Sequence, residues 1–200
     1  SLQQHVVFAT AVGVVHNNLS WEFANQLYDM SRSSNSPDVR EKTLVGVGIL
    51  LYHRKINWVV VKPWIDQGLN DDNVGVRRGS VEAIGRGLAG GPIRWETVQS
   101  YFTDLLGDSQ SVDEEIINSV GASLKEGAVD WEEVEEFLLT SRNSGSEIVA
   151  KETMTAAKTG LQHETLCWHD VSDFLKTAIE TESETVAKEA VRAIGAGLQS

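Results

Sequence analysis

Hydrophobic residues recur along this chain with a period of 36 or 37 residues, and a tryptophan marks the start of each period. Five of the six tryptophans are spaced by 37, 37, 36 and 37 residues, and they are Trp21, Trp58, Trp95, Trp131 and Trp168. A fixed period of roughly 20–50 residues is typical of a repeat array. The pattern therefore predicts five copies of one structural unit.

The first half of each unit carries apolar residues three, six and seven positions after its tryptophan. This spacing predicts a helix that begins at the tryptophan and buries one face. The position seven residues after the tryptophan holds Tyr28, Ile65, Phe102, Leu138 and Leu175. The residue before each tryptophan is expected to cap the helix, and Ser20, Asn57 and Asp130 are of the types that favour this position.

A second apolar stripe follows in each unit and predicts a second helix. Its first position is always valine, at Val39, Val76, Val112, Val149 and Val186. Loops rich in Ser, Asn, Asp and Gly separate the two helices. Glycine recurs inside the second helix, at Gly48, Gly85, Gly121 and Gly195. Because a glycine inside a helix costs about 1 kcal/mol relative to alanine, this recurrence indicates that neighbouring helices approach each other closely.

Each unit is thus a helical hairpin, which buries its apolar face only by stacking on its neighbours. The predicted fold class is all-α, an α-solenoid of about five and a half repeats that forms one domain over residues 1–200. A half repeat covers residues 1–20, and the whole repeats cover 21–57, 58–94, 95–130, 131–167 and 168–200. Eleven helices are expected in all.

The second helices resemble those of the HEAT-repeat family. Three of them read PDVREKTLVGVG, VGVRRGSVEAIGRGL and VAKEAVRAIGAGL, and HEAT repeats typically place an Asp-Val-Arg start and a small residue on this helix. Asp38-Val39-Arg40 and Val76-Arg77 match that start, whereas the later units keep only the valine. The tryptophan that opens each unit is not a usual HEAT feature, and Pro63 is the single proline in a first helix. The resemblance covers the whole chain and implies that the second helices line a concave face.

The net charge of −12 is spread unevenly along the chain. Residues Ser1–Arg94 contain 10 Lys and Arg against 8 Asp and Glu, whereas residues Trp95–Ser200 contain 7 against 21. Because a chain this acidic repels phosphate groups, we expect neither nucleic acid nor an anionic membrane as a partner. The single cysteine excludes a disulfide framework. We expect a soluble, cytoplasmic protein.

The segment HETLCWHD, residues 163–170, resembles a metal or thiol site because it holds two histidines, a cysteine and acids. In the repeat frame, Cys167 occupies the capping position and His163 follows the end of a second helix. Zinc needs three or four converging ligands, and no other segment offers candidates. We therefore expect no metal, no cofactor and no catalytic residue. The alternative is a helical-repeat enzyme or lyase that uses His163–Asp170.

The second helices also carry positions that fall between the buried rows, 20, 24 and 28 residues after the tryptophan. This strip is apolar near the N-terminus and charged further along. We call its N-terminal part the inner strip, and it consists of Phe8, Val12, Val45, Ile49, Arg78, Glu82 and Arg86. Apolar patches rimmed by charge mark partner sites. The predicted function is a non-enzymatic scaffold or adaptor that holds another protein or peptide on the inner strip.

The opening helix, HVVFATAVGVVH, is apolar nearly all round, whereas a terminal helix of a repeat array needs one polar face. Something is therefore expected to cover Phe8 and Val12: upstream residues, a second copy of the chain, or the partner. Self-association through this helix stays open beside partner binding. A third interpretation is an array whose role is only to space other domains.

Overall fold

The fold is all-α, as the sequence predicts. The computed structural model describes residues 2–180 and 183–198, and these residues form eleven α-helices and no strand. A helix begins at each of the five repeat tryptophans. The chain divides into two compact units, Ser1–Ile93 and Arg94–Ser200. This division lies one residue from a predicted repeat boundary, and the continuous solenoid over both units stays a prediction.

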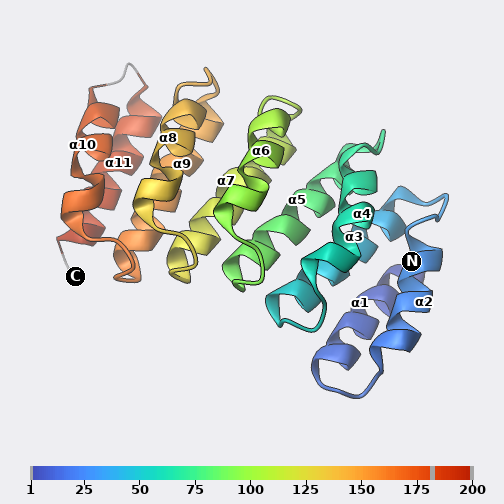
Figure 1. Cartoon of the computed structure of the whole chain (residues 1–200). Helices are drawn as coiled ribbons and strands as arrows, with labels where there is room; N and C mark the ends of the chain where they lie inside the picture. The colour runs from blue at the N-terminus through green and yellow to red at the C-terminus, as the bar shows by residue number, and fades with distance from the viewer. Residues whose placement is uncertain (1, 181–182, 199–200) are drawn as a thin grey trace. The chain divides into compact units, whose positions relative to one another are not determined.

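The first unit contains five helices in two layers (Figure 1). They are α1 (Leu2–Val15), α2 (Trp21–Ser31), α3 (Pro37–Tyr52), α4 (Trp58–Leu69) and α5 (Val74–Ala89). The second helices of the repeats, α1, α3 and α5, pack side by side in one layer, and α2 and α4 cover that layer from one side. α3 is the central helix of this unit, because all four other helices contact it.

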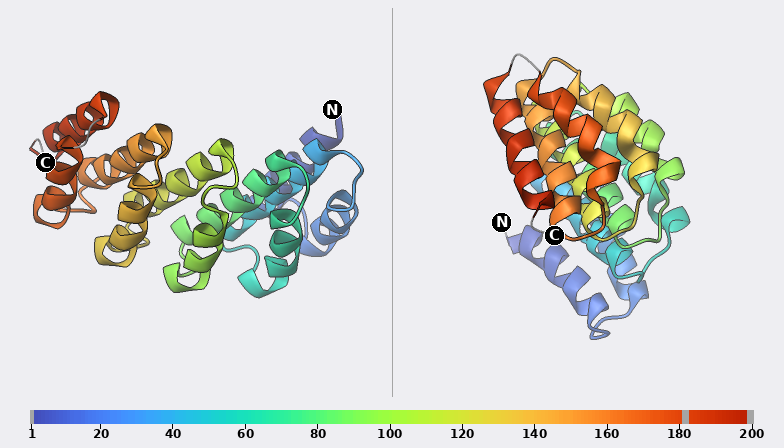
Figure 2. Two further views of the ribbon diagram at one scale, coloured as in Figure 1. Left: turned by 90° about the horizontal axis from the view of Figure 1, so that it is seen from above. Right: turned by 90° about the vertical axis from the view of Figure 1, so that its left-hand side faces the viewer.

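The second unit contains six helices in the same two-layer arrangement (Figure 2). They are α6 (Trp95–Leu105), α7 (Gln110–Lys125), α8 (Trp131–Arg142), α9 (Glu147–Gln162), α10 (Trp168–Ile179) and α11 (Glu184–Gly197). The second helices α7, α9 and α11 form one layer, and α6, α8 and α10 form the other. In both units the second helices contact one another more extensively than the first helices do.

The glycines inside the second helices allow this close packing, as the sequence predicts. A Cβ atom added to Gly48 of α3 would lie 2.8 Å from the Cα atom of Ala83 on α5. A Cβ atom added to Gly121 of α7 would lie 3.2 Å from the Cα atom of Ala156 on α9. The backbones of consecutive second helices therefore approach each other where a larger residue has no room.

Aromatic rings join the first helices of consecutive repeats. In the second unit, Trp95 packs edge-on against Phe137 at 5.4 Å between ring centroids, and Trp131 packs against Phe174 at 5.1 Å. Such edge-to-face pairs are favourable beyond the area that they bury. Trp95 and Trp131 belong to the core, and each is 3% exposed. The other repeat tryptophans lie nearer the surface and are only half-buried.

The residue before each tryptophan is the N-cap of its helix, although the capping groups differ. The Ser20 hydroxyl accepts a hydrogen bond from the backbone N–H of Phe23 at 3.3 Å. At α8 and α10 the N-cap residue forms a capping box, in which its own N–H also donates to a carboxylate three residues on. Asp130 donates to Glu133 at 2.8 Å, and Cys167 donates to Asp170 at 2.9 Å.

The helices are short. The longest of them, α3, α5, α7 and α9, have 16 residues each, whereas crossing a bilayer takes about 20 apolar residues. Within the described ranges, no helix has both the length and the apolar character needed to span a membrane.

Candidate protein-binding surface

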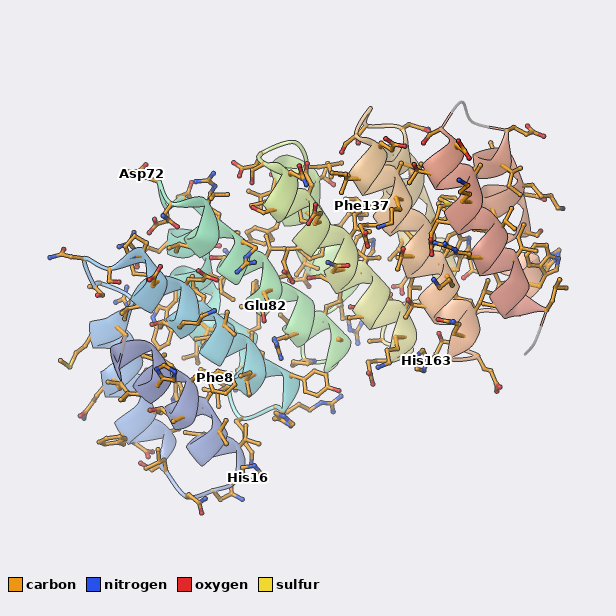
Figure 3. The ribbon with its side chains drawn as sticks, turned by 180° about the vertical axis from the view of Figure 1, so that it is seen from behind. Phe8, His16, Asp72, Glu82, Phe137 and His163 are labelled. Atoms are coloured by element: carbon orange, nitrogen blue, oxygen red, sulfur yellow. The ribbon has the colours of Figure 1, made fainter. Side chains whose placement is uncertain are left out.

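All seven residues of the inner strip lie on second helices of the first unit. Phe8 and Val12 are on α1, Val45 and Ile49 are on α3, and the three charged residues are on α5. Figure 3 looks onto this layer of helices, and Phe8 and Glu82 are labelled there on the side that faces the viewer. The structure therefore brings the predicted residues onto one layer of one compact unit.

The α1 helix buries one side and exposes a second, apolar side. Val7 and Ala11 are at most 1% exposed, and the Val7 carbonyl accepts a hydrogen bond from the buried Tyr28 hydroxyl at 3.4 Å. On the other side, Phe8 is 46% exposed and Val12 is 38% exposed. Exposed single apolar residues are ordinary, but neighbouring ones on a single helix form a patch that favours contact with another molecule.

The middle of the inner strip is less open than the sequence predicts. Val45 is only 6% exposed, so the expectation of an exposed side chain is wrong at this position. The reason is that α3 lies between α1 and α5 and is covered by α2 and α4 as well. Ile49, one turn further along α3, is half-buried. Val45 therefore supports the surface from below, and Ile49 contributes part of its side chain to it.

The α5 end of the inner strip carries two ion pairs. Arg78 on α5 donates to the Glu41 carboxylate on α3 at 2.5 Å, so this pair joins two consecutive repeats. Arg86 donates to Glu82 one turn earlier on α5, at 2.8 and 3.0 Å. The Arg78 and Arg86 side chains are about 40% exposed, at 39% and 43%. Both arginines remain accessible to an acidic or polar group of a bound molecule.

One exposed residue beside the strip was missed from the sequence. Tyr52, at the end of α3, is 36% exposed, and its ring packs edge-on against His53 at 5.1 Å between centroids. It lies three residues after Ile49 and so on the same face of α3. Extending the inner strip along α3 by one more helical turn would have identified Tyr52 from the sequence.

The structure spreads the segment at residues 163–170 over a turn between two helices. His163 is the C-cap of α9 and Cys167 is the N-cap of α10, and both are exposed. The Cys167 thiol and backbone N–H hydrogen-bond to Asp170 and lower the pKa of that carboxyl group. Within the part of the chain that the structure describes, no three His, Cys, Asp or Glu side chains are grouped to hold a metal ion.

The unusual backbone at this turn is a property of the repeat. Glu164 has a φ of 58°, in the left-handed region that non-glycine residues rarely adopt. The same position in the other repeats also has a positive φ, at Asn17, Arg54, Gly91 and Gly127. Because five turns share this conformation, at Glu164 it reflects how a second helix connects to the next first helix and gives no sign of a catalytic centre.

Comparison with known proteins bears on the fold alone. The crystal structure of an engineered protein, a target of the Northeast Structural Genomics Consortium, is similar to this chain with a TM-score of 0.54 and 12% sequence identity. The match covers 98% of this chain and 90% of that one. No protein-family model and no curated protein matches the sequence. The similarity supports the all-helical fold, and the HEAT resemblance stays a prediction.

Proposed function

We propose that this protein is a non-enzymatic adaptor that binds another protein or a peptide with the inner strip of its first unit. The observation that carries the proposal is the exposed apolar side of α1, with Phe8 and Val12 at 46% and 38% exposure. The ion pairs of α5 lie in the same helix layer, on the other side of α3. An apolar centre with a charged rim is the usual make-up of a protein-binding surface.

The geometry favours a partner with one or two apolar anchor residues and a charged flank. The anchors would contact Phe8, Val12 and Ile49, and the flank would exchange hydrogen bonds with the Arg78 and Arg86 guanidinium groups. Fully burying a Val or Phe side chain contributes roughly 1.5–3 kcal/mol, so a few such contacts give useful affinity. We place the protein in the cytoplasm, in line with its single, exposed cysteine.

The test begins with peptides selected from a displayed random library against the whole chain. Their dissociation constants are then measured by fluorescence anisotropy for the wild type, Phe8→Asp and Arg78→Ala. Phe8→Asp is expected to weaken binding at least about tenfold, because a buried charge replaces an apolar contact. Arg78→Ala is expected to weaken it by a smaller factor.

The matched control is Val59→Asp, which places the same charge on α4, where Val59 is 81% exposed. This variant is expected to bind the selected peptides like the wild type. The proposal is wrong if no library peptide binds, or if the peptides bind Phe8→Asp and Val59→Asp equally well.

A further inference from the structure

The exposed side of α1 is the surface by which the other second helices stack. On α5, Ala83 and the stem of Arg86 lie against Gly48 of α3, where an added Cβ atom would come within 2.8 and 2.9 Å of them. The residues two repeats earlier, at the same positions of α1, are Ala9 and Val12. Both are exposed. Among the described residues, α1 therefore presents an unoccupied copy of the interface that exists between α3 and α5.

The complementary half of this interface is open on α11. In α3, Leu44 and Leu51 are covered by the following repeat and are 3% and 0% exposed. Their equivalents on α11 are Val191 and Leu198, which are 56% and 75% exposed. Between them lies Gly195, the equivalent of the α3 glycine. A Cβ atom added there would meet no atom of the described residues within 4 Å.

We propose that the chain associates head-to-tail with a second copy of itself, so that α1 of one copy stacks on α11 of the next. Ala9 then packs on Gly195 as Ala83 packs on Gly48 and as Ala156 packs on Gly121 within one chain. The contact continues the existing stack of second helices across two molecules, and it buries the exposed apolar residues of both ends.

The charges of the two helices allow this pairing. α11 carries Glu184 and Glu189 against Lys188 and Arg192, and α1 carries no Asp, Glu, Lys or Arg. No net charge on these two helices therefore opposes their contact. A head-to-tail contact uses two different surfaces, so a free surface remains at each end of the assembly and longer oligomers form.

The test uses one blocked end at a time, with mass measured by size-exclusion chromatography and light scattering over a wide range of concentrations. Gly195→Leu places a bulky side chain at the open position on α11, where an added Cβ atom meets no atom of the described residues within 4 Å. Phe8→Asp blocks the α1 end. The wild type is expected to grow from monomer to dimer and larger species as concentration rises, and each variant alone is expected to remain monomeric.

The decisive sample is an equimolar mixture of the two variants. The free α11 end of Phe8→Asp fits the free α1 end of Gly195→Leu, so the mixture is expected to form a dimer and nothing larger. Val59→Asp is the control and is expected to oligomerise like the wild type. The inference is overturned if the wild type stays monomeric, if either variant alone still dimerises, or if the mixture stays monomeric.

This inference can fail independently of the proposed function. Gly195→Leu changes α11 only, so it is expected to abolish self-association and to bind the selected peptides at least as tightly as the wild type, whose α1 side is partly occupied by the second copy. Arg78→Ala changes the inner strip and leaves α11 intact, so it is expected to weaken peptide binding and to preserve self-association.

Discussion

The turn between the first and second helix is built differently in the two units. In the first unit, Arg40 at the start of α3 donates to both carboxylate oxygens of Asp71 in the next repeat, at 2.7 and 2.8 Å. In the second unit, Ala150 occupies the position equivalent to Arg40. A pocket of about 310 Å³ lies there, lined by residues that include Arg142 and Ser183. The same repeat position is thus filled by an ion pair in one unit and left open in the other.

A neighbouring arginine shows what the two turns share. Arg32 stacks over the Trp64 ring at 5.7 Å, and Arg142, its repeat equivalent, stacks over the Phe174 ring at 5.0 Å. Arg32 also pairs with Asp29 at 2.7 Å. Arg142 is 8% exposed and donates to the Phe174 carbonyl at 3.0 Å, and burial lowers its pKa. The arginine–aromatic stack comes with the repeat geometry, whereas the carboxylate partner is a local addition.

This comparison indicates that the repeats are held together in two ways. The apolar rows and the aromatic contacts between repeats recur in both compact units, because the geometry of the stacked hairpins requires them. The ion pairs between repeats are individual, and each depends on one residue in each of two repeats. Removing an ion pair is therefore expected to affect one junction and to leave the rest of the array intact.

The largest expected effect is that of Arg40→Ala, which gives the first unit the residue found in the second. The Asp71 side chain is only 14% exposed, so the variant leaves a poorly hydrated carboxylate that keeps the hydrogen bond from the Asn73 N–H and loses both bonds from Arg40. Removing one member of a buried ion pair costs about 3–5 kcal/mol of stability, whereas an exposed ion pair contributes under about 1 kcal/mol. We expect a loss of about 2 kcal/mol for this partly buried pair, measured by hydrogen exchange of α3 and α5.

The second variant of this experiment is Arg40→Ala combined with Asp71→Thr. Thr181 has the position equivalent to Asp71 in the second unit, and it lies outside the described residues. Because the double variant leaves no unpaired carboxylate, we expect it to recover about half of the loss. Exchange in α9 is the internal control and is expected to remain unchanged. Equal losses in α3 and α9 would contradict the view that each ion pair acts at one junction.

A smaller effect is expected from a matched pair of glycine substitutions. In Gly48→Ala the new methyl group meets the Ala83 backbone, and overpacking of this kind costs about 1–3 kcal/mol. The gain in helix propensity of about 1 kcal/mol offsets part of that cost, so we expect a net loss of about 1 kcal/mol. In Gly195→Ala only the gain remains, because the position is open. Thermal unfolding in the monomeric Phe8→Asp background measures both, and stabilisation by both substitutions would contradict the packing described for α3 and α5.

Several features of the fold follow from the sequence because they repeat. The tryptophan spacing places the starts of five helices, and the recurring glycines indicate close approach, which the structure shows at Gly48 and Gly121. The recurrence does not indicate that the last repeat is packed differently from the others. Gly195 occupies the same position as Gly48, yet no following helix packs on it within the described residues.

Features that depend on the register between repeats were not predictable from the sequence. Arg40 and Asp71 are 31 residues apart, and only the three-dimensional stacking of two hairpins brings them together. The burial of Val45 has the same origin, because α1 and α5 approach α3 from both sides and cover a position that the helical period alone leaves open. The apolar surface of α1 was predictable, because it follows from composition along one helix.

Asp71 in the first unit and Asp113 in the second have pKa values that are shifted in opposite directions. In the first unit, hydrogen bonds from Arg40 hold the pKa of Asp71 below its ordinary value. In the second, burial raises the pKa of Asp113, which is 8% exposed, and the neighbouring acids Asp108 and Glu114 add to the shift. The Asp113 carboxylate accepts one hydrogen bond, from the Gly107 N–H at 2.8 Å. Ionisation of Asp71 therefore stabilises the fold, whereas ionisation of Asp113 destabilises it.

The smallest expected effect tests this difference with Asp71→Asn and Asp113→Asn, unfolded by urea at several pH values. A lowered pKa gives stability that is present above the ordinary value of about 4 and is lost as the pH falls below it. Asp71→Asn is therefore expected to be less stable than the wild type at neutral pH, with the difference shrinking below about pH 4.

For Asp113 the effect of pH on stability is the opposite. Its pKa is raised, so the ionised carboxylate destabilises the fold at neutral pH, and protonation relieves this as the pH falls towards about 4. Asp113→Asn keeps an oxygen that accepts from Gly107, so it is expected to match or exceed the wild type at neutral pH by under about 1 kcal/mol. That advantage is expected to disappear in acid, and a loss of stability at neutral pH that persists in acid would show that Asp113 is needed as an ionised acceptor.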